Sequence, residues 1–167
     1  MGRQAVRAAL GVAAMAGALV VAGPAGADGA GGKPFRLALS GANEFNAAGT
    51  PINPHGDADR GSVVLTLNQG QERVCWTFGA ITLTAGEALP HVAHIHEATG
   101  GVAGPVRVDL FGTPSTGPAP PSYPTGVTCV HADADRITDI RQNPENYYVN
   151  LHNAQHPGGV MRAQLSD

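Results

Sequence analysis

The chain is short of charge and of aromatic side chains. Of its 167 residues only 14% are charged and 5% are aromatic, and Lys33 is the single lysine. The formal net charge of −3 argues against binding to nucleic acid, because that function needs clustered Lys and Arg. We therefore expect no nucleic-acid partner and a core built from Val, Leu, Ile and Ala.

Several motifs of common enzymes are also absent. The sequence has no Gly-x-Ser-x-Gly nucleophile elbow, and no Lys-Ser/Thr pair follows Gly100-Gly101 to make a phosphate loop. The carboxylates are scattered, with no pairing typical of a glycosidase. These absences favour a binding module over an enzyme.

The first 27 residues have the pattern of a secretory signal peptide. Arg3 and Arg7 precede an apolar run at residues 8–22, and small residues lead up to Ala27. The run has about 15 residues, fewer than the roughly 20 that a bilayer span needs, so a retained membrane anchor is the weaker alternative. We expect Sec-type export with cleavage after about Ala27 and no membrane span after cleavage. A flexible leader at residues 28–34 and one domain at residues 35–167 would follow.

Cys75 and Cys129 are the only cysteines. An even number in an oxidising compartment is typical of a disulfide. A bridge between them would close a loop of about 55 residues, worth about 4 kcal/mol in the chain-entropy description. Two metal-binding thiolates are the alternative, but neither cysteine has a second one nearby. We expect the disulfide Cys75–Cys129.

Short runs of β-forming residues alternate with turn clusters from residue 35 onward. The runs lie at residues 35–39, 63–67, 72–83, 92–97, 106–111, 146–152 and 159–165. One helical pattern stands at residues 133–142, where Ile137 and Ile140 lie three apart on one face and an aspartate can cap the start. This pattern predicts an all-β, antiparallel Greek-key sandwich or barrel with one short helix.

Five short segments resemble the CHRD domain family, which is named for its repeats in chordin. They read LSGANE at 39–44, AHIH at 93–96, GPVRVDL at 104–110, YVNLH at 148–152 and PGGVMRAQL at 157–165. They follow the family's order and cover essentially all of residues 35–167. The resemblance implies an extracellular, β-rich module, and it implies no particular reaction.

Four of the seven histidines form a candidate metal site. His94 and His96 are two apart on a predicted strand, so both point to one face. His152 alternates with the apolar residues of a second strand, which puts it off the core face, and His156 follows four residues later. Imidazole nitrogens suit copper and zinc. If the two strands are neighbours, we expect a copper or zinc site at His94, His96, His152 and His156, with binding that weakens below about pH 6. Histidines that only hydrogen-bond backbone or carboxylate groups are the alternative.

The sequence HVAHIHE at residues 91–97 is also similar to the copper-ligand strand of copper–zinc superoxide dismutases. That family has a metal-bridging histidine and zinc ligands shortly after this strand, whereas residues 98–130 here contain no histidine. We therefore expect a non-catalytic extracytoplasmic binding module with a metal site. A metal-free matrix or adhesion module is the alternative, and it would bind protein or glycan through the loops at residues 46–60 and 112–126. A dismutase-like enzyme is the third hypothesis.

Overall fold

The computed structural model describes residues 32–112 and 123–166. The expected signal peptide and residues 28–31 of the leader lie outside these ranges. The strands are β1 (Lys33–Ser40), β2 (Arg60–Asn68), β3 (Arg73–Phe78), β4 (Val92–Glu97), β5 (Val106–Phe111), β6 (Thr128–His131), β7 (Tyr147–His152) and β8 (Met161–Gln164). The α-helix α1 (Ala134–Gln142) connects β6 to β7.

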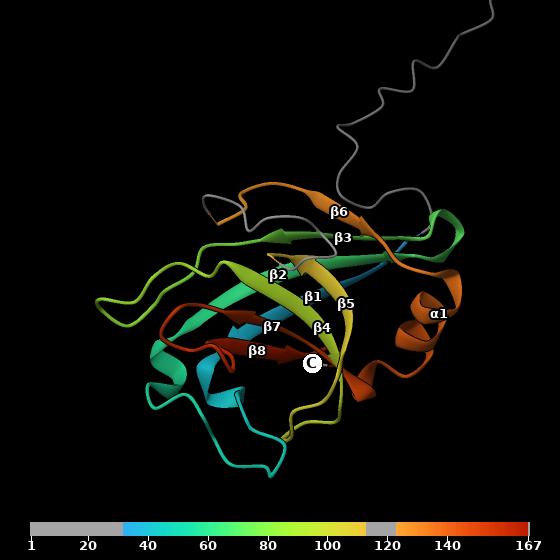
Figure 1. The fold of residues 1–167 in the computed structure, drawn as a ribbon. Coiled ribbons are helices and arrows are strands. Elements are labelled where there is room, and N and C mark those ends of the chain that lie inside the picture. Colours follow the sequence, from blue (N-terminus) through green and yellow to red (C-terminus); the bar gives the residue numbers. More distant parts are fainter. Residues whose placement is uncertain (1–31, 113–122, 167) are drawn as a thin grey trace, which may run out of the picture.

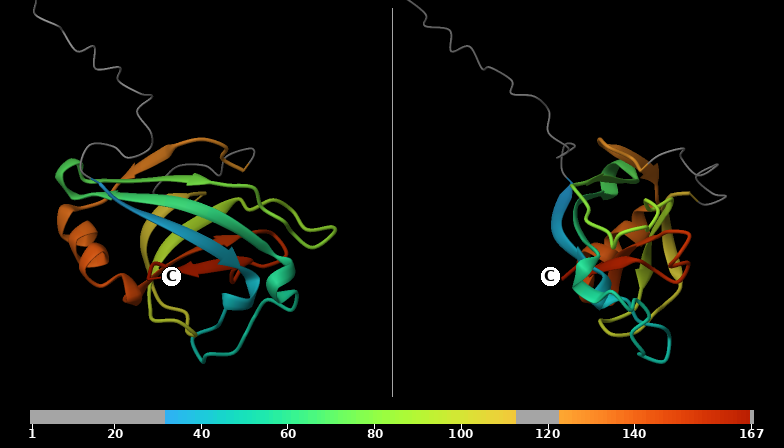
Figure 2. Two further views of the ribbon diagram at one scale, coloured as in Figure 1. Left: turned by 180° about the vertical axis from the view of Figure 1, so that it is seen from behind. Right: turned by 90° about the vertical axis from the view of Figure 1, so that its left-hand side faces the viewer.

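The strands form one antiparallel sheet in the order β5-β4-β7-β8-β1-β2-β3-β6 (Figure 1). The sheet curls into a nearly closed barrel, which is clearest when it is viewed from the side (Figure 2). Three of the adjacent pairs, β4–β7, β8–β1 and β3–β6, join strands that are not consecutive in the chain. That order excludes a simple up-and-down barrel and confirms the predicted antiparallel class.

The core fills the barrel with one face of each strand. In β1, for example, Phe35, Leu37 and Leu39 are buried while the residues between them face outward. Helix α1 lies against one end of the barrel (Figure 1) and buries Ile137 and Ile140 completely, as its pattern predicted. Asp133 precedes the helix, but its side chain makes no capping hydrogen bond.

Two strands differ from the prediction. The run at residues 72–83 ends as a strand at Phe78, after which the Gly79 amide makes a last hydrogen bond to the Ser62 carbonyl of β2. Only Thr82 returns, in an isolated bridge to Arg60. Strand β6 was not predicted, because its four residues are too few for an alternating pattern and none of them is fully buried.

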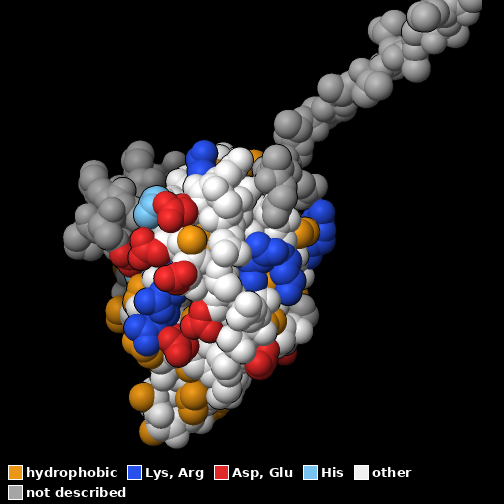
Figure 3. All heavy atoms as spheres, turned by 90° about the vertical axis from the view of Figure 1, so that its right-hand side faces the viewer, with side chains coloured by type: hydrophobic (Ala, Val, Ile, Leu, Met, Phe, Trp, Pro, Cys, Tyr) orange, Lys and Arg blue, Asp and Glu red, His pale blue; other side chains and the backbone are white. Residues whose placement is uncertain are grey.

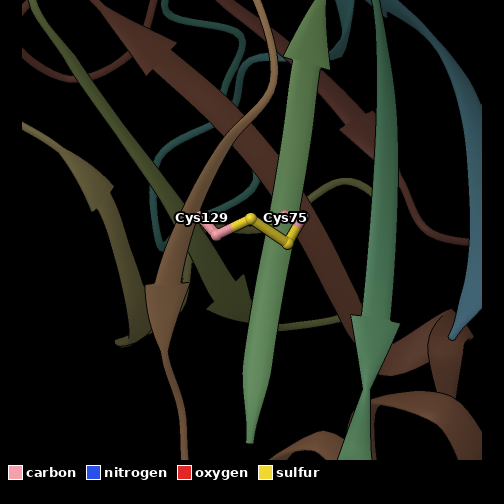
Figure 4. Close-up of a disulfide and its surroundings, with 2 residues drawn as sticks. All are labelled: Cys75 and Cys129. Atoms are coloured by element: carbon pink, nitrogen blue, oxygen red, sulfur yellow. A yellow bond between two sulfur atoms is a disulfide. The ribbon is translucent and has the colours of Figure 1, made fainter. Parts of the chain in front are cut away.

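The disulfide Cys75–Cys129 joins β3 to β6, as predicted (Figure 4). The two cysteines are directly opposite each other in the antiparallel register, with Cα atoms 4.0 Å apart. Because β6 pairs only with β3, the bridge fixes an end strand of the sheet to its single neighbour.

The face of the molecule that carries α1 is densely charged, with acidic and basic side chains next to one another (Figure 3). Near it, a polar hollow separates the two end strands of the sheet and the start of α1. Its polar lining consists of Arg107, Asp109, His131, Asp133 and Arg136. In the part of the chain that the structure describes, no helix combines the length and the apolar character that a membrane span requires.

Candidate metal centre

Three of the four predicted ligands meet where β4 pairs with β7. The antiparallel register sets Val92 opposite His152, His94 opposite Asn150 and His96 opposite Tyr148. Because the register pairs residues of the same face, His94 and His96 share the outer face of the sheet with His152. The residues between them, such as Ile95, point into the core. The adjacency on which the sequence prediction depended is therefore present.

The three imidazoles, which we call the histidine trio, are close enough to share one ion. One ring nitrogen from each lies within 4.8 Å of the others. His94 Nδ1 is 3.1 Å from His152 Nε2, and the His94 and His96 ring centroids are 5.2 Å apart. Two nitrogens that bind one tetrahedral ion at about 2.0–2.1 Å are about 3.3 Å apart. The observed nitrogen pair is close to that separation.

The other nitrogen of each imidazole faces an oxygen atom. His96 Nδ1 lies 2.8 Å from the Gly104 carbonyl oxygen, and His152 Nδ1 lies 3.0 Å from that of Pro157. These contacts place N–H on Nδ1 and leave Nε2 of both rings as a lone pair. His94 Nε2 faces an Asp109 carboxylate oxygen at 3.8 Å. A hydrogen-bonded oxygen behind the imidazole, as His96 and His152 have, fixes the tautomer and ring orientation and is typical of histidines that bind metals.

One buried nitrogen of the trio lacks a well-placed partner. His96 Nε2 makes no hydrogen bond of normal geometry to any described residue, although the Asn150 side chain lies near enough to influence the pKa of His96. His152 Nε2 is 3.1 Å from both Asn150 Oδ1 and His94 Nδ1, while its Nδ1 faces Pro157. A neutral imidazole has only one N–H, so His152 can accept from His94 at Nε2 but cannot also donate to Asn150. A cation between the three nitrogens would satisfy His96 Nε2.

Burial keeps the trio neutral. It lowers the pKa of His94 to about 4, and the neighbouring His96 adds to this effect. Burial also lowers the pKa of His152 to about 4, with a further contribution from His94. The pKa of His96 is lowered too, mainly by burial. Metals bind the neutral imidazole, so the protonation state of the trio at neutral and mildly acidic pH is the one that a metal site requires.

The loop at residues 98–105 is held over the trio by a buried arginine. Arg162 of β8 donates hydrogen bonds to the carbonyl oxygens of Val102 and Thr99, at 2.7 and 3.0 Å. Its guanidinium lies over the Tyr148 ring, 3.3 Å from the centroid, and the other stacking partner of that ring is His96, at 4.9 Å. The Tyr148 hydroxyl in turn accepts a hydrogen bond from the Gly104 amide.

A buried carboxyl group lies beneath this layer. Burial raises the pKa of Glu44 to about 8, even though the Arg162 charge and a hydrogen bond from Asn150 favour its ionised form. Asn150 thus connects Glu44 to His152. The alternation in β7 that put His152 off the core face also applies to Tyr148 and Asn150. The burial of this polar layer was not predicted, because the loops that cover it come from distant parts of the chain.

His156, the predicted fourth ligand, is not part of the trio. Its Nε2 atom is 2.8 Å from a Glu87 carboxylate oxygen, and His55 lies on the same oxygen at 3.5 Å. The turn that follows β7 carries His156 toward the loop between β3 and β4, so proximity in sequence to His152 was misleading. Of the remaining histidines, His91 lies near His152, since its charge depresses the pKa of that residue, and the exposed His131 pairs with Glu72.

The metal-free hypothesis depends on the loops at residues 46–60 and 112–126, and the structure describes the first in full and the second in part. Residues 46–60 fold back on themselves through a bridge between Phe45 and Pro51, and the Asn46 carbonyl oxygen accepts a hydrogen bond from Ala103. Most of the second loop, residues 113–122, lies outside the described residues.

The fold class is an all-β antiparallel barrel with one helix and one disulfide. The CHRD domain model matches residues 35–165, so the chain belongs to the CHRD domain family. CHRD domains are typically extracellular. No curated protein and no solved structure matches the chain.

Proposed function

We propose that this protein is exported and acts outside the cytoplasm as a non-catalytic module that binds one copper or zinc ion through His94, His96 and His152. The observation that carries the proposal is the convergence of three imidazole nitrogens, of which His96 Nε2 is buried and makes no hydrogen bond of normal geometry to the described residues. The donor set fits the ion, because neutral imidazole binds both metals. Copper(II) should bind more tightly than zinc, as the general order of divalent affinities requires.

The oxygen atoms behind the three rings would act in two ways. They fix which nitrogen faces the ion, and they make that nitrogen a better donor. Asp109 would also contribute negative charge beside a bound cation, and the same residue lines the polar hollow between the end strands. Asp109 therefore lies between the hollow and His94 of the trio.

The test is a titration of the metal-free full chain with copper(II) and zinc at pH 7. His96→Phe keeps an aromatic ring to stack on Tyr148 and removes both nitrogens. We expect it, and His94→Ala, to weaken copper binding by more than about 100-fold, beyond the 10–100-fold typical of losing an outer partner. His131→Ala is the matched control, because this histidine is exposed and lies outside the trio. Unchanged copper binding in both folded trio variants would contradict the metal site, and superoxide turnover above background by the copper-loaded protein would contradict a non-catalytic role.

A further inference from the structure

We infer that the barrel has a second metal site, a zinc-type site formed by His55, Glu87 and His156. We call these three residues the loop cluster. They come from three separate loops: the segment before β2, the connection from β3 to β4 and the connection from β7 to β8. One ligand atom from each lies within 4.8 Å of the others, and none of the three belongs to the histidine trio.

The arrangement is built around the Glu87 carboxylate. Its Oε1 atom is 2.8 Å from His156 Nε2 and 3.5 Å from His55 Nε2. The two imidazole rings meet edge to face, with centroids 5.7 Å apart. Both histidines thus bring Nε2 to one carboxylate oxygen, with a hydrogen bond from His156, and a small outward rotation of the side chains would leave room for an ion between the three ligand atoms.

Glu87 is an unusual surface carboxylate because its side chain is only 5% exposed. A nearly buried anion needs positive charge or several hydrogen bonds to offset the loss of hydration. Among the described residues, its ion-pair partners are two histidines and no lysine or arginine. A divalent cation would provide the missing charge.

Two buried asparagines hold the ligands in position through hydrogen bonds. Asn153 donates to Glu87 Oε2 at 2.9 Å and to the Ala88 carbonyl, and its own side-chain oxygen accepts from the His156 amide at 2.7 Å. One residue therefore orients two of the three ligands. Such outer partners are a regular part of metal sites.

Asn53 does the same for the third ligand. Its side-chain oxygen accepts a hydrogen bond from the His55 amide at 2.8 Å, and its NH₂ group bonds Asp59 and the Val160 carbonyl. The segment that carries His55 is thereby tied to the buried start of β8.

Two imidazoles and one carboxylate are a recurrent zinc ligand set, with a fourth position left for water. The His55 side chain is 39% exposed, whereas that of His156 is 11% exposed. The open position would therefore lie on the His55 side, toward solvent. This donor set contains a hard oxygen and differs from the all-nitrogen trio, so its preference for copper over zinc should be smaller than that of the trio.

The experiment is a zinc titration of the metal-free full chain by calorimetry, with cobalt(II) absorption as an independent readout of ligand geometry. We expect two zinc equivalents for the unmodified protein. Glu87→Gln keeps the shape and an acceptor for Asn153, and His55→Ala changes an exposed side chain, so neither should prevent folding. Each should remove one zinc equivalent, or weaken it by at least about 100-fold, and should reduce the cobalt(II) bands of that site.

The matched control is the exposed pair of Glu72 and His131, which has the same residue types at 3.3 Å but no third ligand. Glu72→Gln should leave zinc stoichiometry unchanged. His96→Phe should also remove one equivalent and leave the loop cluster's zinc in place, which separates the two sites. The inference is overturned if folded Glu87→Gln and His55→Ala variants keep the zinc stoichiometry and affinity of the unmodified chain.

Discussion

His94 Nδ1 and His152 Nε2 lie 3.1 Å apart across two adjacent antiparallel strands, although 58 residues separate them in the chain. The spacing arises because the register sets Val92 opposite His152, which makes His94 the diagonal neighbour of His152 on the same face. The strand pairing thus brings the two residues together, and the Pro157 carbonyl in the following loop orients the His152 ring.

Acidification should destabilise the metal-free protein through this pair. In the folded state the pKa values of His94 and His152 are about 4, whereas an unfolded histidine titrates near 6.5. Between these values the unfolded chain binds more protons, so the free energy of unfolding falls as the pH drops from about 6.5 to 4. Urea unfolding across this range measures the loss, and NMR of the imidazole protons gives the midpoints. Midpoints near 6.5 for both rings would contradict the prediction.

The same values revise the pH dependence expected from the sequence. Proton competition for an ordinary histidine begins near pH 6, but His94 and His152 remain neutral to about pH 5. We expect copper affinity at pH 5.5 to be within about threefold of that at pH 7, and to fall steeply between pH 5 and 4. Copper titrations at fixed ionic strength test this, and a steep loss that begins already at pH 6.5 would contradict it.

Glu44 should make stability depend on pH in the opposite direction. Its folded pKa of about 8 lies above the ordinary value of 4.5, so the folded state binds more protons between these values. The free energy of unfolding should therefore be fully supported below about pH 4.5 and should fall as the pH rises toward 8. Between pH 6.5 and 8, above the range in which the trio histidines titrate, Glu44→Gln should show a flatter dependence by at least about 1.4 kcal/mol, the equivalent of one pKa unit. Parallel curves for the two proteins would count against a protonated Glu44.

Gly104→Ala should weaken copper binding by the trio without removing any of its three ligands. A Cβ atom at this position would press on the Glu97 carbonyl group, so the loop must shift and the Gly104 carbonyl must leave His96 Nδ1. We expect copper affinity to fall about 10–100-fold, the usual cost of losing an outer partner. Gly100→Ala is the control, because a Cβ there meets nothing within 4 Å. Equal copper affinities in the two variants would rule out this role for Gly104.

Replacing both cysteines should reduce stability and leave the trio intact. Cys75→Ser with Cys129→Ser removes the covalent link between β6 and β3, which then stay together only by strand pairing. The free energy of unfolding should fall by about 2–5 kcal/mol. Copper binding of the folded variant should match that of the unmodified protein, since β3 and β6 are not adjacent to β4 or β7. Guanidinium unfolding and copper titration of one sample measure both effects. A loss of copper binding with no loss of stability would contradict a purely structural role of the disulfide.

The sequence determined the local features of this protein. Alternation of apolar residues predicted β4 and β5 with their observed bounds, and it put His94, His96 and His152 off the core face, because side-chain direction along a strand follows from the backbone alone. The family-specific segments and the cysteine pair indicated the class and the disulfide. Only the tertiary structure decided which strands are neighbours, and so which histidines meet. His156 joined Glu87 and His55 instead of the trio, and Glu44 and Arg162 became buried, because those positions depend on loops whose paths are set by long-range packing and by no local pattern.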